Sequence, residues 1–449
     1  MKKRVFLILA VAALISIAWV SWSHLVNGKK SSPISEPAVA VALDWNKHVL
    51  VADRFTEGFR APVSARAEAY IGLAAWEAAL PGLPNGYRSL GERFPDLQLP
   101  KAEAADYHLP SILNACYSTI ILKLFSMTPP TVEHQRVELE KRWLASFAGK
   151  IDPGTLRRSE DFGKKVALAV YEWSASDSLG HMANLHNFDR NYTQPVGDGF
   201  WQPCIDFPTP SLLPYWGETR TFMIQTEDWL ASPLPAFSTE PNSVYYRQAM
   251  EVLTLNSPLS AENQWIAEFW SDDHPGLTFS PASRWICIAN QVIEKEAPPA
   301  AKALETYLRL GFAMSDAMVS CWHSKYYYNL LRPETFIQTW IQPDWRPIAH
   351  TPPFPSYPSG HAIVSAAAAE VLTQLYGENY KMTDRSHEGR TELKGTPRSF
   401  RSFHEMAFEG AFSRIPLGAH FRIDCEEGTR QGLLIGKEVI KLTLTEPVR

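Results

Sequence analysis

The stretch PPFPSYPSGHA, residues 352–362, separates an irregular, proline-rich segment from an alanine-rich one. The prolines up to Pro358 disfavour regular secondary structure, whereas the run that follows, AIVSAAAAEVL, is rich in strong helix formers. Ser359 is a favourable N-cap residue between the two. The sequence therefore predicts a helix that begins directly after Ser359 and a chain that is punctuated by proline on its N-terminal side.

The first turn of this helix has the composition of an anion-binding site. Gly360 leaves its backbone N–H accessible to a close ligand, and the free amides of a first turn, together with the helix dipole, favour negative charge. His361 would lie in the same turn, where the positive field disfavours its protonation, and a neutral histidine beside an anion can exchange protons with it. A capped helix with an unrelated histidine explains these residues equally well when they are taken alone.

A second segment, KYYYNLLRP at residues 325–333, carries two cations. Lys325 and Arg332 are seven positions apart, which is two helical turns, so we expect them to share one helix face. Pro333 disfavours helical backbone for the residue before it, which predicts that the helix ends at Arg332. By itself such a pair is more typical of a solvated helix end than of a binding site.

A third segment, SRIPLGAHFRID at residues 413–424, contains another cation and a histidine–carboxylate pair. Arg414 precedes a proline break, and His420 and Asp424 are four positions apart, so the carboxylate can reach the imidazole. A carboxylate there fixes the tautomer and raises the basicity of the other ring nitrogen. Such a histidine can serve as a nucleophile or a metal ligand, and the alternative is a surface ion pair.

Taken together, the three segments supply the donors that a tetrahedral oxyanion requires, both forked and single. They provide three cations, a hydroxyl, a glycine amide and two histidines: Lys325, Arg332, Arg414, Ser359, Gly360, His361 and His420. The joint pattern is more specific than any of its parts, because each part alone has a common structural explanation.

The order K-x6-RP, PSGH and SR-x5-H-x3-D resembles the signature of the superfamily that joins vanadium-dependent haloperoxidases to type-2 phosphatidic acid phosphatases and bacterial class A acid phosphatases. The resemblance covers residues 325–424. It implies a vanadate cofactor bonded through vanadium to His420, with Asp424 supporting that histidine rather than contacting the vanadate itself. The remaining donors would neutralise the vanadate oxygens, Lys325 would polarise the bound oxidant, and His361 would exchange protons. Phosphate could occupy the same site.

Flanking residues favour the haloperoxidase branch. Trp322 and Phe354 resemble the pair that lines the halide side of the pocket in fungal chloroperoxidases, and the chain departs at Phe354 from algal bromoperoxidases, which carry histidine there. The stretch FWSDDHPG, residues 269–276, resembles the segment whose aspartate supports the acid–base histidine. Asp273 aligns with that aspartate, and Asp272 is the second choice. Chain length and the lack of several apolar spans also argue against a minimal acid phosphatase and a lipid phosphatase.

The activity implied by the resemblance is oxidation of halide by hydrogen peroxide to hypohalous acid, which then halogenates a small organic acceptor. Iodide is the easiest halide to oxidise, and bromide is next. One alternative is an exported acid phosphatase of the same superfamily, with His420 as nucleophile, His361 as general acid and Asp424 orienting His420. The other is a non-catalytic oxyanion-binding protein. The motifs leave halide choice, organic substrate and oligomeric state open.

The rest of the chain predicts an all-α protein, a multi-helix bundle of the vanadium haloperoxidase and acid phosphatase type. Alternating strand patterns are nearly absent, and residues 31–60 are interpreted as a linker. We expect one helical domain over residues 31–449, with the active-site half at about 260–445. Helices are predicted at 64–80, 110–127, 131–149, 156–176, 243–255, 261–273, 282–297 and 299–331, with long loops at 177–243.

The N-terminus and the overall charge bear on location and partners. Residues 1–30 begin with three basic residues and continue with an apolar run, which is typical of an export signal, and the run is nearly long enough to act as a membrane anchor. We therefore expect a periplasmic or extracellular protein. A net charge of −5 gives no indication of nucleic-acid binding. None of the five cysteines forms a CxxC pair, so a zinc site is not indicated.

Overall fold

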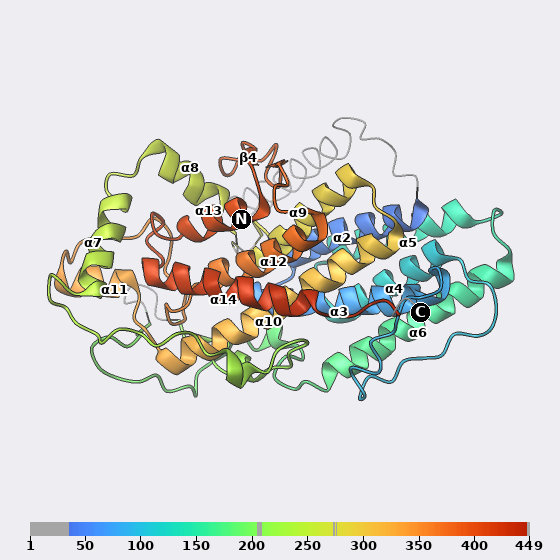
Figure 1. The fold of residues 1–449 in the computed structure, drawn as a ribbon, viewed down its shortest axis with the longest axis horizontal. Coiled ribbons are helices and arrows are strands. Elements are labelled where there is room, and N and C mark those ends of the chain that lie inside the picture. The colour runs from blue at the N-terminus through green and yellow to red at the C-terminus, as the bar shows by residue number, and fades with distance from the viewer. Residues whose placement is uncertain (1–35, 204–208, 273, 275, 447–449) are drawn as a thin grey trace, which may run out of the picture.

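The computed structural model describes residues 36–203, 209–272, 274 and 276–446. Its regular structure is overwhelmingly helical, which confirms the all-α prediction (Figure 1). The α-helices are α2 (Pro37–Phe55), α3 (Ala61–Ala79), α4 (Leu109–Leu124), α5 (Pro130–Phe147), α6 (Pro153–Ala175), α7 (Val244–Asn256), α8 (Ala261–Phe269), α9 (Pro281–Glu296), α10 (Ala300–Tyr328), α11 (Pro333–Trp340), α12 (Gly360–Tyr376), α13 (Phe403–Phe412) and α14 (Arg422–Ile440).

The remaining elements are short. Two antiparallel pairs of strands, β1 with β2 and β3 with β4, cover only a few residues each, and single turns of 3-10 helix connect the longer helices. These elements are η1 (Leu80–Gly82), η2 (Ala183–Leu185), η3 (Trp216–Glu218), η4 (Thr226–Trp229), β1 (Phe188–Asp189), β2 (Ser211–Leu212), β3 (Met382–Asp384) and β4 (Arg398–Phe400). The loop-rich region predicted at 177–243 is confirmed where the structure describes it.

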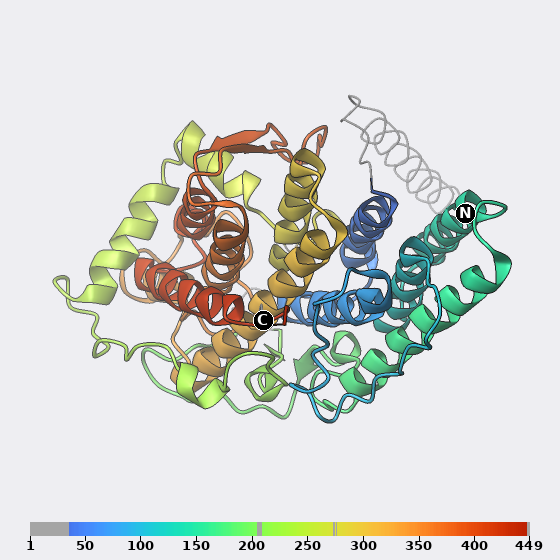
Figure 2. The same ribbon diagram turned by 45° about the vertical axis from the view of Figure 1, so that its right-hand side comes forward.

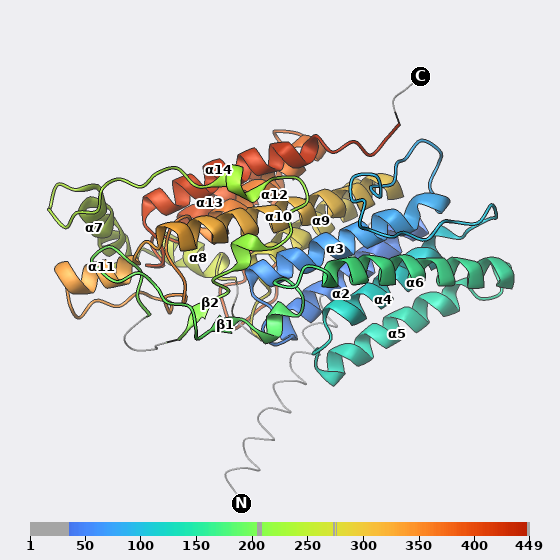
Figure 3. The same ribbon diagram turned by 90° about the horizontal axis from the view of Figure 1, so that it is seen from below.

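Helix α10 connects the two ends of the bundle. It packs against α3 on one side and against α12 and α14 on the other. Figure 2 shows the early helices α2–α6 grouped at one end of the molecule and the late helices α12–α14 at the other, with α10 between them. Figure 3, seen from below, shows the same separation along the long axis. The three predicted motif segments therefore belong to neighbouring elements at the late-helix end.

The closest helix contact in that half is between α12 and α14. A Cβ atom added at Gly432 would lie 2.2 Å from the carbonyl oxygen of Ile363, and one added at Gly428 would lie 2.7 Å from that of Ser359. Only glycine at these positions allows the two backbones to approach this closely. The packing fixes the start of α12 relative to the start of α14, and both starts carry predicted site residues.

We expect Gly432→Ala to destabilise the protein by about 2 kcal/mol, because the added methyl group must push α14 away from α12 backbone. The free energy of unfolding from denaturant titration measures this. Leu434→Ala is the matched control, since Leu434 lies on the same helix and is 40% exposed, and its expected change is about 0.5 kcal/mol. Equal losses in the two variants would contradict the proposed role of close helix contact.

The interpretation of residues 31–60 as a linker was wrong. Residues 37–55 form α2, which buries Val41, Trp45 and Val49 in the main hydrophobic cluster. These three residues are four positions apart, which places them on one helix face. Pro37 occupies the first turn of the helix, where its missing N–H costs nothing. The continuous apolar run at residues 38–43 and the polar residues Asn46 and His48, which are themselves buried, concealed the helical period.

The predicted end of the long helix at Arg332 was also wrong. Helix α10 ends at Tyr328, because Asn329 adopts left-handed backbone with φ of 50°, a conformation in which asparagine ends helices more readily than most residues do. Leu330 then pairs with Phe200 as an isolated antiparallel bridge. Arg332 has extended backbone and caps α11. Lys325 and Arg332 thus do not share a helix face, and a turn brings them to the site separately.

None of the helices in the described part of the chain is both long and apolar enough to cross a membrane. The predicted export signal or anchor at residues 1–30 lies outside the described residues. The four cysteines that the structure describes, Cys116, Cys287, Cys321 and Cys425, are free thiols. Cys204 lies outside the described residues.

Candidate active site

The start of α12 is built as the sequence predicts. Ser359 is the N-cap, and its hydroxyl accepts a hydrogen bond from the Ala362 amide at 3.4 Å. The Ser359 amide donates to the carbonyl of Asp424 at 2.9 Å, which joins this helix start to the start of α14. Gly360 is the first helical residue, and a Cβ atom there would lie 3.5 Å from the Trp322 ring. The predicted helix start after Ser359 is confirmed.

His420 is held from one side by Asp424. Its Nδ1 lies 2.9 Å from the Asp424 carboxylate, which also accepts hydrogen bonds from the Phe421 amide at 3.0 Å and from the Ser356 hydroxyl. His420 precedes α14, so the pair forms because Asp424, in the first turn, reaches back to the helix start. With Nδ1 donating to the carboxylate, the lone pair of His420 is on Nε2.

Arg332 lies on the Nε2 side of His420 and is 1% exposed. Its Nη1 is 3.2 Å from Nε2 and donates to the carbonyl of Ala419 at 2.9 Å, and its Nε donates to the carbonyl of Phe354 at 2.9 Å. Its Nη2, by contrast, is buried without a hydrogen-bond partner. A buried guanidinium donor is costly to leave unpaired, so this atom indicates where an anionic ligand would bind.

Lys325 is fully buried and donates all three of its N–H bonds to backbone carbonyls of the proline-rich segment. The acceptors are Pro355 at 2.9 Å, Ser356 at 2.8 Å and Pro358 at 2.6 Å. Burial lowers the pKa of Lys325, and the nearby Arg332 lowers it further. As described, Lys325 shapes the segment that leads to Ser359, and it would have to exchange one carbonyl to contact an oxyanion directly.

Arg414 and His361 form a second contact pair of the site. The Arg414 guanidinium donates to the Ser413 hydroxyl at 2.9 Å and to the carbonyl of Trp270 at 2.6 Å, and its Nη1 is 3.4 Å from His361 Nε2. Burial and the Arg414 charge lower the pKa of His361 well below its usual value. Burial and Arg332 do the same for His420. Both imidazoles are therefore neutral at neutral pH.

Residues 305–446 match the family described as the VCPO second helical-bundle domain. Vanadium chloroperoxidase from Curvularia inaequalis is 24% identical over 277 residues, which are 47% of this chain and 46% of that protein. The chain thus aligns with about half the length of this curated relative.

Solved structures extend the similarity over nearly the whole chain. A bacterial vanadium-dependent iodoperoxidase has a TM-score of 0.78 and 29% identity, with 94% of this chain and all of that one covered. The chain is thus similar in sequence and fold to vanadium haloperoxidases. The holo form of a bacterial vanadium-dependent chloroperoxidase, at 15% identity and a TM-score of 0.64 over 87% of this chain and 93% of that one, shares the fold.

The two aromatic residues predicted for the haloperoxidase halide pocket lie against the cations. The Trp322 and Phe354 ring centroids are 5.0 Å apart. Lys325 Nζ is 5.0 Å from the Phe354 centroid, and the Arg332 guanidinium carbon is 4.8 Å from it. These rings make one wall of the site apolar while their faces stabilise the neighbouring positive charges.

Of the two aspartates considered for support of His361, Asp273 lies outside the described residues. Asp272 is buried, and its carboxylate is 3.4 Å from Arg284 and 3.6 Å from His387. Sequence reasoning missed both of these partners, and it also missed Ser356, which bonds Asp424. Ser356 stands within the opening motif, but nothing local indicates that its side chain faces a residue 68 positions later.

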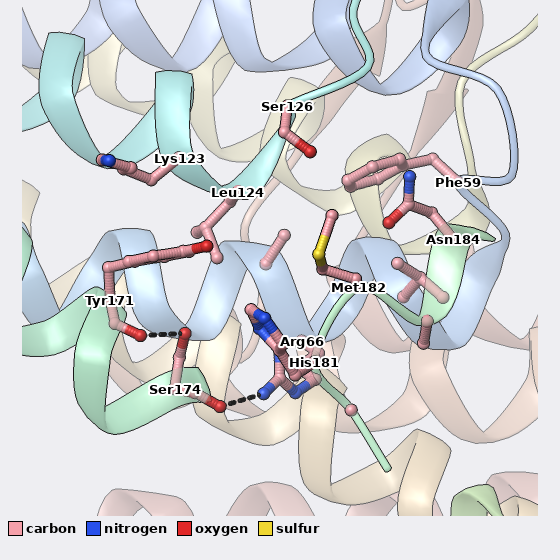
Figure 4. Close-up of a pocket in the computed structure, with 14 residues that line it drawn as sticks. Phe59, Arg66, Lys123, Leu124, Ser126, Tyr171, Ser174, His181, Met182 and Asn184 are labelled. Carbon is pink, nitrogen blue, oxygen red and sulfur yellow. Dashed lines mark hydrogen bonds between the residues drawn. The ribbon is translucent and has the colours of Figure 1, made fainter. Parts of the chain in front are cut away.

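A separate small pocket is lined by other residues, including Phe59, Lys123, Tyr171, His181 and Met182 (Figure 4). The one arginine in its lining, Arg66, is bonded to Asp177 and to the carbonyl of Ser174. Within the described ranges, no three His, Cys, Asp or Glu side chains are grouped so as to hold a metal ion.

Proposed function

We propose that this chain is a vanadate-dependent haloperoxidase, which uses hydrogen peroxide to oxidise halide, iodide and bromide above all, to hypohalous acid. The observation that carries the proposal is the unpaired, buried Nη2 of Arg332 next to His420, whose Nε2 lies 3.2 Å from Arg332 Nη1. The similarity to a bacterial iodoperoxidase over its full length supports iodide as a substrate.

The residues of the site fit vanadate. His420 offers one neutral nitrogen ligand, whose tautomer is fixed by Asp424, and a vanadium atom needs no further protein ligand when its other ligands are oxygens. Arg332 Nη2 and Arg414 can hold those oxygens as forked donors, and Ser359 and the Gly360 amide provide neutral donors at the helix start. Phosphate would satisfy the oxygen-binding donors equally well.

Bound vanadate would supply a Lewis acid that activates hydrogen peroxide toward halide without changing its own oxidation state. The chain supplies the rest. His361, neutral because of burial and Arg414, accepts a proton from incoming hydrogen peroxide at a ring nitrogen and returns it to the leaving hydroxide as water forms. Arg332 and Arg414 stabilise negative charge in a buried setting, and the wall of Trp322 and Phe354 limits water at the approach of the halide.

We also propose where the protein is located, what it acts with and how its chain is divided. The basic and apolar start of the chain supports export to the periplasm or the exterior, with the N-terminal run either cleaved or kept as an anchor. A small organic acceptor would consume the hypohalous acid, and the negative net charge supports no nucleic-acid partner. Asp273 is proposed to tune His361, and residues 31–449 to form one domain with its active-site half at about 260–445.

The test is peroxide-dependent iodide oxidation by the purified apo-protein, with and without orthovanadate, alongside p-nitrophenyl phosphate hydrolysis. We expect triiodide to form only with vanadate, and added phosphate to slow its formation by competition. Phosphate ester hydrolysis that vanadate inhibits, without halide oxidation, would instead assign the acid phosphatase alternative and make His420 the nucleophile. Oxyanion binding without either turnover would leave only a binding protein.

A further inference from the structure

Besides Arg332 and Arg414, a further buried arginine contacts the segment between α8 and α9. Arg284, in the first turn of α9, has no exposed surface. Its Nη2 and Nε donate to Asp384 at 2.8 and 3.2 Å. Its Nη1 donates to the carbonyl of Phe269 at 3.1 Å and lies 2.6 Å from His387 Nε2 and 3.4 Å from Asp272. Its guanidinium also lies over the rings of Phe269 and Trp270, with distances of 4.5 and 4.7 Å to the centroids.

The segment that Arg284 holds carries the carbonyl that orients Arg414. The Trp270 carbonyl accepts from Arg414 Nη2 at 2.6 Å and from the Asp272 amide at 3.0 Å. Arg414 also donates to Ser413, and its remaining nitrogen faces His361 at 3.4 Å. A shift of the Trp270 carbonyl would therefore rotate the guanidinium away from the oxyanion position.

Arg284 is itself fixed from the opposite side. Asp384, its main partner, accepts further hydrogen bonds from the Ser386 amide at 2.8 Å and from Gln291 at 3.2 Å. Hydrogen bonds thus fix Asp384 to the β3 segment and to α9. Because Arg284 pairs with Asp384 and also donates to Phe269, it restrains the position of residues 269–272. Two carboxylates, a carbonyl and a histidine nitrogen around one guanidinium require the forked, planar geometry of arginine, which a lysine ammonium group does not reproduce.

We propose that Arg284 is a positioning residue of the oxyanion site, which sets the orientation of Arg414 through the backbone of Phe269–Asp272. The proposal deepens the proposed function and rests on it, since the ligand that Arg414 would bind is vanadate or phosphate. Groups that orient the direct ligands of a metal or anion commonly contribute about 10- to 100-fold in affinity. Arg284 would be such a group although it has no contact with the ligand itself.

The test is the variant Arg284→Lys, which keeps the positive charge and removes the forked guanidinium group. We expect its dissociation constants for orthovanadate and for inorganic phosphate, measured by calorimetric titration of the apo-protein, to rise by about tenfold. Arg309→Lys is the matched control. Arg309 is also buried, pairs with Glu305 at 2.7 Å and bonds the carbonyls of Val439 and Leu442 at 2.7 and 2.8 Å. Both variants should lose thermal stability, and only Arg284→Lys should lose oxyanion affinity.

The outcomes separate this proposal from the proposed function. Wild-type affinity in a folded Arg284→Lys protein, or an equal loss in Arg309→Lys, would overturn the positioning role alone. Absence of vanadate and phosphate binding in the wild-type protein would overturn both proposals. If Arg284→Lys does not fold, the same calorimetric titration of Asp384→Asn tests whether Arg284 positions the site. That variant keeps the arginine and removes its main charge partner, and we expect a several-fold weaker affinity.

Discussion

Replacing His420 by alanine is expected to abolish vanadate-dependent iodide oxidation, with kcat/KM reduced by at least about 10³-fold, which corresponds to about 4 kcal/mol. The reason is that His420 Nε2 carries the lone pair that would bind vanadium, because Asp424 fixes the tautomer of the ring. Its other nitrogen is occupied by Asp424 at 2.9 Å. We also expect the affinity for orthovanadate to fall far more than the affinity for phosphate, because phosphate needs only the oxygen-binding donors. Activity assays and calorimetric titration of the same preparations measure both quantities.

The variant should fold, because Asp424 keeps its bonds to the Phe421 amide and to Ser356 when the imidazole is removed. His48→Ala is the matched control, since His48 is also a buried histidine but lies in α2 against Trp45, with 5.9 Å between the ring centroids. It should lose stability and keep vanadate affinity. If His420→Ala retained vanadate-dependent turnover, the ligand would have to be another group, and the proposed cofactor site would be wrong.

The parts of this site that were predictable from the sequence are those with local causes. Ser359 caps α12 because a serine after proline and before an alanine-rich run has few other conformations of similar stability. The pairing of His420 with Asp424 needs only a helix start between them. The path of Arg332, in contrast, depends on the left-handed Asn329 and on the bridge between Leu330 and Phe200. A bridge across 130 positions has no local signature in a single sequence.

The errors and omissions elsewhere have the same origin. Helix α2 was missed because residues 38–43 are continuously apolar and buried polar residues such as Asn46 and His48 follow them, so that only packing against α4 and α9 shows which face is buried. The Arg284 cluster was missed because its partners, Phe269, Asp272 and Asp384, are up to 100 positions away. Each of these residues alone looks like an ordinary surface charge or core aromatic residue. Only the tertiary packing brings them to one buried point.

Replacing His361 by alanine is expected to separate binding from turnover. We predict that kcat for iodide oxidation falls by about 10²- to 10⁴-fold, the usual contribution of a positioned proton-transfer group. The dissociation constant for orthovanadate should change by less than about threefold, a shift of under 1 kcal/mol. The physical reason is that Arg414 has two further anchors, Ser413 and the Trp270 carbonyl, so its orientation does not depend on the imidazole.

His404→Ala is the matched control for this variant. His404 lies on α13, and its Nε2 is 2.8 Å from Glu370 on α12, the same helix that carries His361. Its loss should leave both kcat and vanadate affinity near the wild-type values. If His361→Ala lost affinity and turnover together, His361 would be a binding group and not the proton-transfer residue. If it lost neither, proton transfer would have to occur elsewhere, and the depressed pKa of His361 would reflect only its burial beside Arg414.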